Sequence, residues 1–133
     1  MTHDELVQEA FKAMKNAYAP YSLYHVGACV LCKDGKTFYG GNIENAAYPS
    51  GVCGERSAIF GAYSYGYRKD DIEAIAIVSD GERIGTPCGM CRQVLSELLN
   101  PETPIILSNG KQVMETNIKE LLPYNFGAVD LVK

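Results

Sequence analysis

Apolar residues recur with helical spacing in three segments of the chain, and a short fourth segment also favours a helix. The first segment carries Thr2 three residues before Glu5, which is the pattern of a capping box, and it ends before Pro20. Pro87 stands at the start of the third segment, where its missing N–H group costs nothing. The pattern predicts helices over residues 2–19, 53–66, 87–98 and 117–122.

Five shorter runs of apolar and β-branched residues predict strands. Asp34-Gly35 separates the first two runs and Asn109-Gly110 separates the last two, and such dipeptides favour hairpin turns. The third run is nearly all apolar, which is typical of a buried central strand. The expected strands cover residues 24–31, 36–41, 72–78, 105–107 and 112–114. This order of elements predicts an α/β fold with one mixed sheet, whose last two strands are antiparallel.

Between the second strand and the second helix, residues 42–52 show neither helical nor strand periodicity. Polar side chains together with Pro49, Ser50 and Gly51 are typical of a loop. A loop of this length in a compact protein often carries functional residues. We therefore expect this loop to contribute to a site.

Length and charge narrow the possible functions. A chain of 133 residues has the size of one compact domain, so a single domain over residues 1–133 is expected. Its net charge of −4 and its scattered basic residues argue against a nucleic-acid partner. No apolar stretch approaches the roughly 20 residues that a bilayer requires, and the acidic N-terminal residues are unlike a secretory signal. We therefore expect a cytoplasmic protein that binds neither nucleic acid nor membrane.

Five cysteines are an odd number, and in a reducing compartment they are better explained as thiols or metal ligands than as disulfides. Cys88 and Cys91 are three residues apart at the start of a predicted helix, so their sulfurs share one face. Cys53 begins the preceding helix, and helix N-termini favour thiolates, which bind zinc. Three sulfur ligands leave one tetrahedral position open for water, as in catalytic zinc sites.

A second Cys-x-x-Cys pattern, Cys29 and Cys32, leaves an alternative open. Together with Cys88 and Cys91 it could form a four-cysteine structural zinc site. Cys29 falls within a predicted strand, however, where residues three apart point to opposite faces of the sheet. The pattern therefore favours Cys29 and Cys32 as ordinary buried or strand-end thiols.

Two charged residues follow Cys53. Glu55 does not share the helical face of Cys53, so we interpret it as a carboxylate that reaches the metal-bound water and carries protons. Three thiolates and Zn²⁺ sum to −1, which weakens the metal as a Lewis acid. Arg56 could draw charge from the sulfurs by hydrogen bonding, and we interpret it as a residue that tunes the zinc.

Together these residues resemble the small, homotetrameric, zinc-dependent cytidine deaminases. The wider class of zinc deaminases has a Cys₃ or His/Cys/Cys site, a glutamate that is not a ligand, and a Pro-Cys-x-x-Cys signature. The resemblance covers nearly the whole chain and implies a three-layer α-β-α sandwich around a five-stranded mixed sheet. It rests on Tyr18-Ala-Pro-Tyr-Ser22, Val26-Gly-Ala28, Gly41-Asn-Ile-Glu-Asn-Ala46, Cys53-Gly-Glu-Arg56, Pro87-Cys-Gly-Met-Cys-Arg-Gln93 and Glu120-Leu-Leu-Pro123.

The resemblance implies an activity and a role for each matching residue. The activity is hydrolytic deamination of cytidine and 2′-deoxycytidine in pyrimidine salvage, with one Zn²⁺ per subunit and active sites shared within a homotetramer. The implied roles are zinc ligands for Cys53, Cys88 and Cys91, proton shuttle for Glu55, ribose binding for Asn42 and Glu44, base contacts for Tyr24 and the backbone N–H of Gly54, and contacts donated by a neighbouring subunit for Tyr48 and Phe126.

The chain departs from the family pattern at three positions: Gly54 and Cys29 stand where Ala is usual, and His25 stands where Pro is usual. Three other functions remain as alternatives. A polynucleotide deaminase is disfavoured by the acidic charge and by the hairpin at Asn109, because relatives of that type have parallel final strands. A deaminase of another small cytosine nucleoside, of the blasticidin S type, and a non-catalytic zinc-stabilised binding module are the other two.

Overall fold

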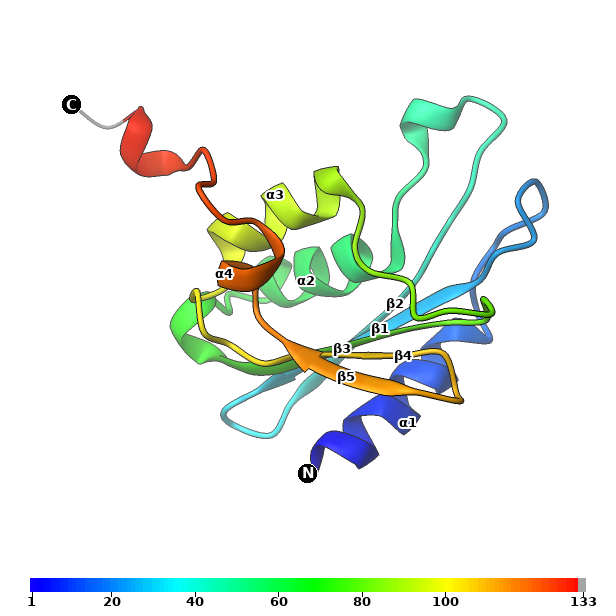
Figure 1. Ribbon diagram of the computed structural model, residues 1–133, viewed down its shortest axis with the longest axis horizontal. Helices are drawn as coiled ribbons and strands as arrows, with labels where there is room; N and C mark the ends of the chain where they lie inside the picture. Colours follow the sequence, from blue (N-terminus) through cyan, green and yellow to red (C-terminus); the bar gives the residue numbers. More distant parts are fainter. Residues whose placement is uncertain (132–133) are drawn as a thin grey trace.

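A five-stranded mixed sheet forms the centre of the computed structural model, which describes residues 1–131 (Figure 1). The strand order is β2-β1-β3-β4-β5. Only β3 and β4 pair in parallel, and every other neighbouring pair is antiparallel. The predicted antiparallel pairing of the last two strands is thus confirmed. The strands are β1 (Val26–Cys32), β2 (Thr37–Gly41), β3 (Ile72–Ser79), β4 (Ile105–Ser108) and β5 (Val113–Thr116).

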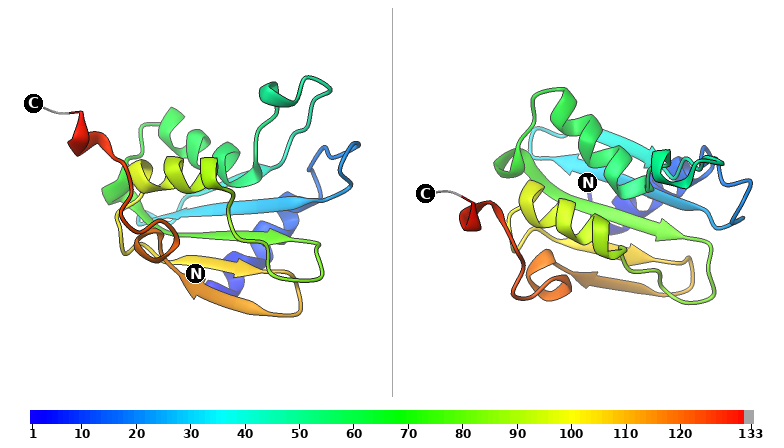
Figure 2. Two further views of the ribbon diagram at one scale, coloured as in Figure 1. Left: turned by 45° about the horizontal axis from the view of Figure 1, so that its top comes forward. Right: turned by 90° about the horizontal axis from the view of Figure 1, so that it is seen from above.

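Helices cover both faces of the sheet and complete three layers. The helix α1 (His3–Met14) packs on one face, whereas α2 (Gly54–Ser64) and α3 (Gly89–Leu98) lie side by side on the other (Figure 2). The short helix α4 (Ile118–Leu121) packs against α3. The predicted α-β-α sandwich with a five-stranded mixed sheet is therefore confirmed. No helix within residues 1–131 is both long and apolar enough to cross a membrane.

Side chains along each strand point alternately to the two faces of the sheet, so the hydrophobic core consists of two clusters, one on each face. In β1, Ala28, Val30 and Cys32 face the layer of α2 and α3, whereas Cys29 and Leu31 face α1. Cys29 and Cys32 thus point to opposite faces of the sheet and cannot hold one metal ion together. Burial raises the pKa of the Cys29 thiol to about 12 and that of Cys32 to about 11, as expected for unreactive core thiols.

The first helix is shorter than the sequence predicts. It ends at Met14, although the apolar spacing continues to Tyr18. Tyr18 instead pairs with the loop after β2: its N–H donates to the carbonyl of Asn42 (2.8 Å), and its carbonyl accepts from the N–H of Glu44 (2.8 Å). These long-range backbone bonds replace helical bonds in that segment. They also place residues 42–44 beside the loop that precedes β1.

Candidate metal centre and substrate pocket

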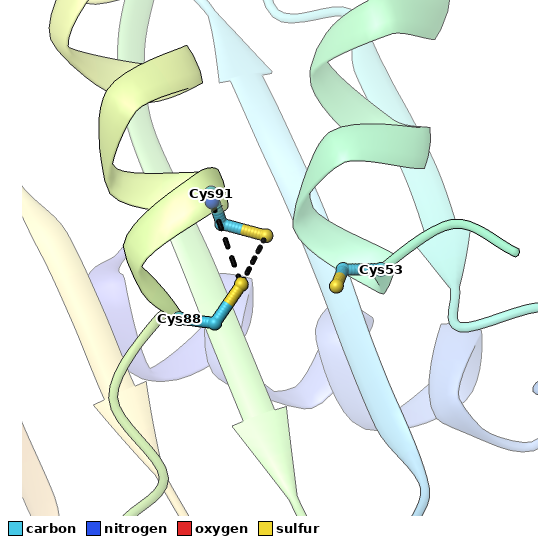
Figure 3. Close-up of side chains that lie close together, drawn as sticks. All are labelled: Cys53, Cys88 and Cys91. Atoms are coloured by element: carbon cyan, nitrogen blue, oxygen red, sulfur yellow. Dashed lines mark hydrogen bonds between the residues drawn. The ribbon is translucent and has the colours of Figure 1, made fainter. Parts of the chain in front are cut away.

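The sulfurs of Cys53, Cys88 and Cys91 lie within 4.8 Å of one another (Figure 3). Cys53 is the N-cap of α2, Cys88 is the N-cap of α3, and Cys91 lies in the first turn of α3. The Cys88 and Cys91 sulfurs are 3.4 Å apart, and the N–H of Cys91 points at the Cys88 sulfur at 3.5 Å. The fold thus brings together the three cysteines that the sequence singled out.

The donor set fits a zinc ion. Zn–S bonds of about 2.3 Å in tetrahedral geometry place sulfurs roughly 3.8 Å apart, close to the spacing in this cluster. Hydrogen bonds from Cys91 and Arg56 lower the pKa of the Cys53 thiol, although partial burial opposes this effect. Within residues 1–131, no other group of three His, Cys, Asp or Glu side chains could hold a metal. Three protein ligands leave a fourth tetrahedral position open.

Glu55 lies in the first turn of α2, beside the sulfur cluster. Its side chain is only 5% exposed, and burial raises the pKa of its carboxyl to about 7. Cys53, Cys88 and Glu55 line one cavity of about 240 Å³. A carboxyl group with a pKa near neutrality can both accept and return a proton at physiological pH.

Arg56 contacts the sulfur cluster but does not line the cavity that contains Glu55. Its Nη2 donates to the Cys53 sulfur at 3.6 Å, and its Nη1 donates to the Met90 sulfur at 3.2 Å. The guanidinium thus places positive charge beside a sulfur ligand, as the interpretation of Arg56 as a tuning residue requires. The contact with Met90 was not expected from the sequence, because nothing in the pattern distinguishes that methionine.

Asn42 and Glu44 brace the loop before β1. The Asn42 amide accepts from the N–H of Val26 and donates to the carbonyl of Tyr24, both at 2.9 Å. The Glu44 carboxylate accepts the N–H groups of Tyr21 and Ser22 at 3.1 Å, and also the Ser22 hydroxyl. Both side chains line the cavity that contains Glu55.

We expect Asn42→Ala to destabilise the protein as well as the pocket. The substitution removes the side-chain partner of the N–H of Val26 and of the carbonyl of Tyr24, two partly buried hydrogen bonds worth about 0.5–1.5 kcal/mol each. Urea unfolding would show this as a lower midpoint with an unchanged slope. An unchanged midpoint would mean that the bracing bonds contribute nothing to folding.

Of the two residues expected to contact the base, Tyr24 lines the cavity that contains Glu55, and Gly54 is not among the residues that line it. Tyr24 lines the cavity at the end near Asn42 and Glu44. Gly54 is buried against β1, and a Cβ atom there would lie 3.2 Å from both the Cγ1 and the carbonyl oxygen of Val26. Glycine at this position lets α2 approach the sheet closely, and an alanine would require Val26 to shift by a few tenths of an ångström.

Tyr48 and Phe126 lie outside the cavity that contains Glu55. Their side chains are 75% and 59% exposed, and they belong to the loop before α2 and the C-terminal segment, which project away from the sheet (Figure 1). The carbonyl of Phe126 accepts from the Gln93 side chain at 2.8 Å, which ties this segment to α3. Tyr48 instead lines a second cavity, of about 350 Å³, together with Asn42, Glu44 and Cys53.

Comparison with known proteins gives the family. The family model for the cytidine and deoxycytidylate deaminase zinc-binding region matches residues 1–107. The chain belongs to the cytidine deaminase family. It is 46% identical to a cytidine deaminase of Halalkalibacterium halodurans over 98% of both chains, and 44% identical to one of Sporosarcina psychrophila over 98% and 96%.

Solved structures of cytidine deaminases share the fold of this chain. The enzyme of Burkholderia pseudomallei has a TM-score of 0.91 at 43% identity, with 95% of this chain and all of that chain covered. The enzyme of Mycobacterium tuberculosis has a TM-score of 0.79 at 33% identity, with 96% and 98% covered. The similarity therefore extends over the helices and strands that carry the sulfur cluster and the pocket.

This member of the cytidine deaminase family has pocket residues that the sequence did not identify. Ser22, Val26, Ser79, Gly85 and Thr86 line the same cavity as Glu55. His25 lies beside the pocket but forms a pair with Asp80 (2.7 Å) and is not part of the sulfur cluster. The one available signal was that Ser79 ends a buried strand, since ligands of α/β proteins often bind at the ends of such strands.

Proposed function

We propose that this protein catalyses the zinc-dependent hydrolytic deamination of free cytidine and 2′-deoxycytidine to uridine and 2′-deoxyuridine. One observation carries the proposal: the buried Glu55 lies beside three convergent cysteines in a cavity that Asn42 and Glu44 also line. Membership of the cytidine deaminase family supports it. The single domain 1–133 would act in the cytoplasm, in pyrimidine salvage.

In this proposal Cys53, Cys88 and Cys91 hold one Zn²⁺ per subunit. When bound, zinc supplies Lewis-acid chemistry and lowers the pKa of a coordinated water toward neutrality. Arg56 donates to the Cys53 sulfur and offsets part of the negative charge of the three thiolates.

Glu55 moves the protons of the reaction. It accepts a proton from the attacking water, whose oxygen forms a bond to C4 of the cytosine ring. It gives this proton to N3, then takes the second proton of the added water from the new C4 hydroxyl group and passes it to the exocyclic nitrogen as that hydroxyl becomes a carbonyl. The C4–N bond breaks and ammonia leaves, so cytidine and water become uridine and ammonia. The burial that raises the pKa of Glu55 to about 7 suits this exchange.

The far end of the cavity would hold the rest of the nucleoside. Asn42 and Glu44 bind the ribose, Tyr24 lies beside the base, and the backbone N–H of Gly54 faces the base. Asn42 and Glu44 already hold backbone groups, but a carboxylate and an amide oxygen have further lone pairs for a sugar hydroxyl. The small cavity and the net charge of −4 favour a free nucleoside over a polynucleotide.

A homotetramer would complete each pocket with residues of neighbouring subunits. Tyr48 and Phe126 are exposed on projecting segments, as residues donated to another subunit would be. Sedimentation at micromolar concentration should give four times the 14.5 kDa chain mass. We expect Tyr48→Ala to raise KM severalfold without changing the number of bound zinc ions. A fully active monomer would contradict the shared site.

An absorbance assay tests the proposed function. Purified protein is mixed with cytidine, deoxycytidine or CMP, with and without a chelator. We expect the cytosine absorbance to fall with the two nucleosides only, and the chelator to prevent it. An unchanged absorbance with all three compounds would favour a zinc-stabilised binding module. Turnover of blasticidin S alone would indicate a deaminase of that type.

A further inference from the structure

Ser79, the last residue of β3, carries a buried hydroxyl group without a partner. Its side chain is 3% exposed, and no hydrogen-bond partner for its Oγ occurs among residues 1–131. Burying a hydroxyl group without a hydrogen bond costs free energy, so such groups are rare unless a ligand satisfies them. We propose that Ser79 binds the nucleoside substrate directly, an inference that rests on the proposed deaminase function.

The strand register directs Ser79 toward the pocket. Ser79 pairs with Val26 across the β1–β3 ladder, so the two side chains share one face of the sheet. Ile77, two residues earlier on the same face, packs in the core beneath α2 and α3. The N-termini of these helices carry Cys53 and Cys88, so Ser79 lies on the face of the sheet that they cover.

Ser79 is the polar side chain that the strands contribute to this cavity. The other strand residues whose side chains share this face and line the cavity, Val26 and Ile77, are apolar. Apolar side chains exclude water but cannot orient a polar ligand, whereas one hydroxyl can both donate and accept a hydrogen bond. Within an apolar floor, Ser79 would therefore fix the position of a carbonyl oxygen or hydroxyl group of the nucleoside.

Neighbouring residues keep this corner of the cavity open and rigid. A Cβ atom at Gly85 would lie 3.2 Å from the Ser79 Oγ and 2.3 Å from the Tyr24 hydroxyl, so only glycine leaves both hydroxyls in place. Asp80 accepts from the backbone N–H of His25 at 3.0 Å, and its second oxygen lies 2.7 Å from the His25 ring. This pair fixes Tyr24 and Ser79, which precede His25 and Asp80 in the chain.

Two serine-to-alanine variants test the proposal. Ser79→Ala removes the unpartnered hydroxyl, and Ser108→Ala is the matched control. Ser108 is also buried, at the end of the adjacent strand β4, but its hydroxyl accepts from the N–H of Gly110 at 3.0 Å and does not line the cavity. Steady-state kinetics with cytidine and thermal unfolding are measured for both variants and for the wild type.

For Ser79→Ala we expect KM to rise about three- to tenfold, because the bound substrate loses one hydrogen bond between uncharged groups. The unfolding midpoint should stay unchanged or rise, because the free protein loses no bond. For Ser108→Ala we expect the reverse, a lower midpoint and an unchanged KM. An unchanged KM in Ser79→Ala, or a raised KM accompanied by a lower midpoint, would overturn the proposal.

The wild type separates this proposal from the proposed function. Its turnover of cytidine tests the function, and the ratio of the variant's KM to that of the wild type tests Ser79. If the wild type binds cytidine without converting it, calorimetry compares the two affinities instead, and equal affinities would overturn the role of Ser79. Absence of both binding and turnover in the wild type would overturn both proposals.

Discussion

Replacement of Glu55 by glutamine is expected to lower kcat for cytidine by about 10²–10⁴-fold while one zinc ion per chain remains bound. Glutamine has nearly the same shape as glutamate but cannot accept and return a proton. The three sulfurs come from Cys53, Cys88 and Cys91, so the metal site keeps all its ligands. Turnover is followed by the loss of cytosine absorbance, and metal content by atomic absorption.

A stability measurement distinguishes this chemical effect from a structural one. The Glu55 side chain is 95% buried, and burial disfavours its charged form, so an uncharged side chain should not lower the unfolding midpoint. The control is Glu97→Gln, which changes an exposed carboxylate on α3 and should leave kcat unchanged. A Glu55→Gln enzyme with near wild-type kcat would contradict the assignment of Glu55 as the proton shuttle.

The sequence predicted most of the fold because its signals are local. Asp34-Gly35 and Asn109-Gly110 indicate two hairpins, and the structure has antiparallel pairs around both. The end of the first helix was wrong for a reason that is not local. Residues after Met14 have a helical apolar pattern, but the backbone of Tyr18 bonds to Asn42 and Glu44 more than 20 residues away. Such pairing overrides local spacing.

For the candidate site, too, the local patterns of the sequence were predictive and the long-range contacts were not. Spacing within one helix turn identifies Cys88 and Cys91, and the resemblance supplied Asn42 and Glu44. Neither indicated that Asn42 braces the backbone of Tyr24. Ser79 was missed because its place in the pocket depends on its register with Val26, 53 positions earlier in the chain. Pairing between strands that are distant in the sequence produces no periodic pattern, so the sequence alone does not place such a side chain in the pocket.

Cys88→Ala is expected to remove zinc and activity together. Loss of a side chain that only supports a metal ligand costs about 10–100-fold in metal affinity, so loss of one of three ligands should cost more. Cys88 is the exposed member of the sulfur cluster, so alanine there leaves no cavity in the core. Zinc per chain after gel filtration and the rate of cytidine deamination should both fall below a tenth of the wild-type values.

Cys32→Ala is the matched control, because it removes a thiol from the core instead of from the cluster. Cys32 is 1% exposed and packs with Val30 and Ile59 beneath α2, so the substitution should lower the unfolding midpoint while zinc and kcat stay unchanged. Loss of zinc from both Cys32→Ala and Cys88→Ala would favour the four-cysteine site. The strand geometry opposes that result, since Cys29 and Cys32 face opposite layers of the sandwich.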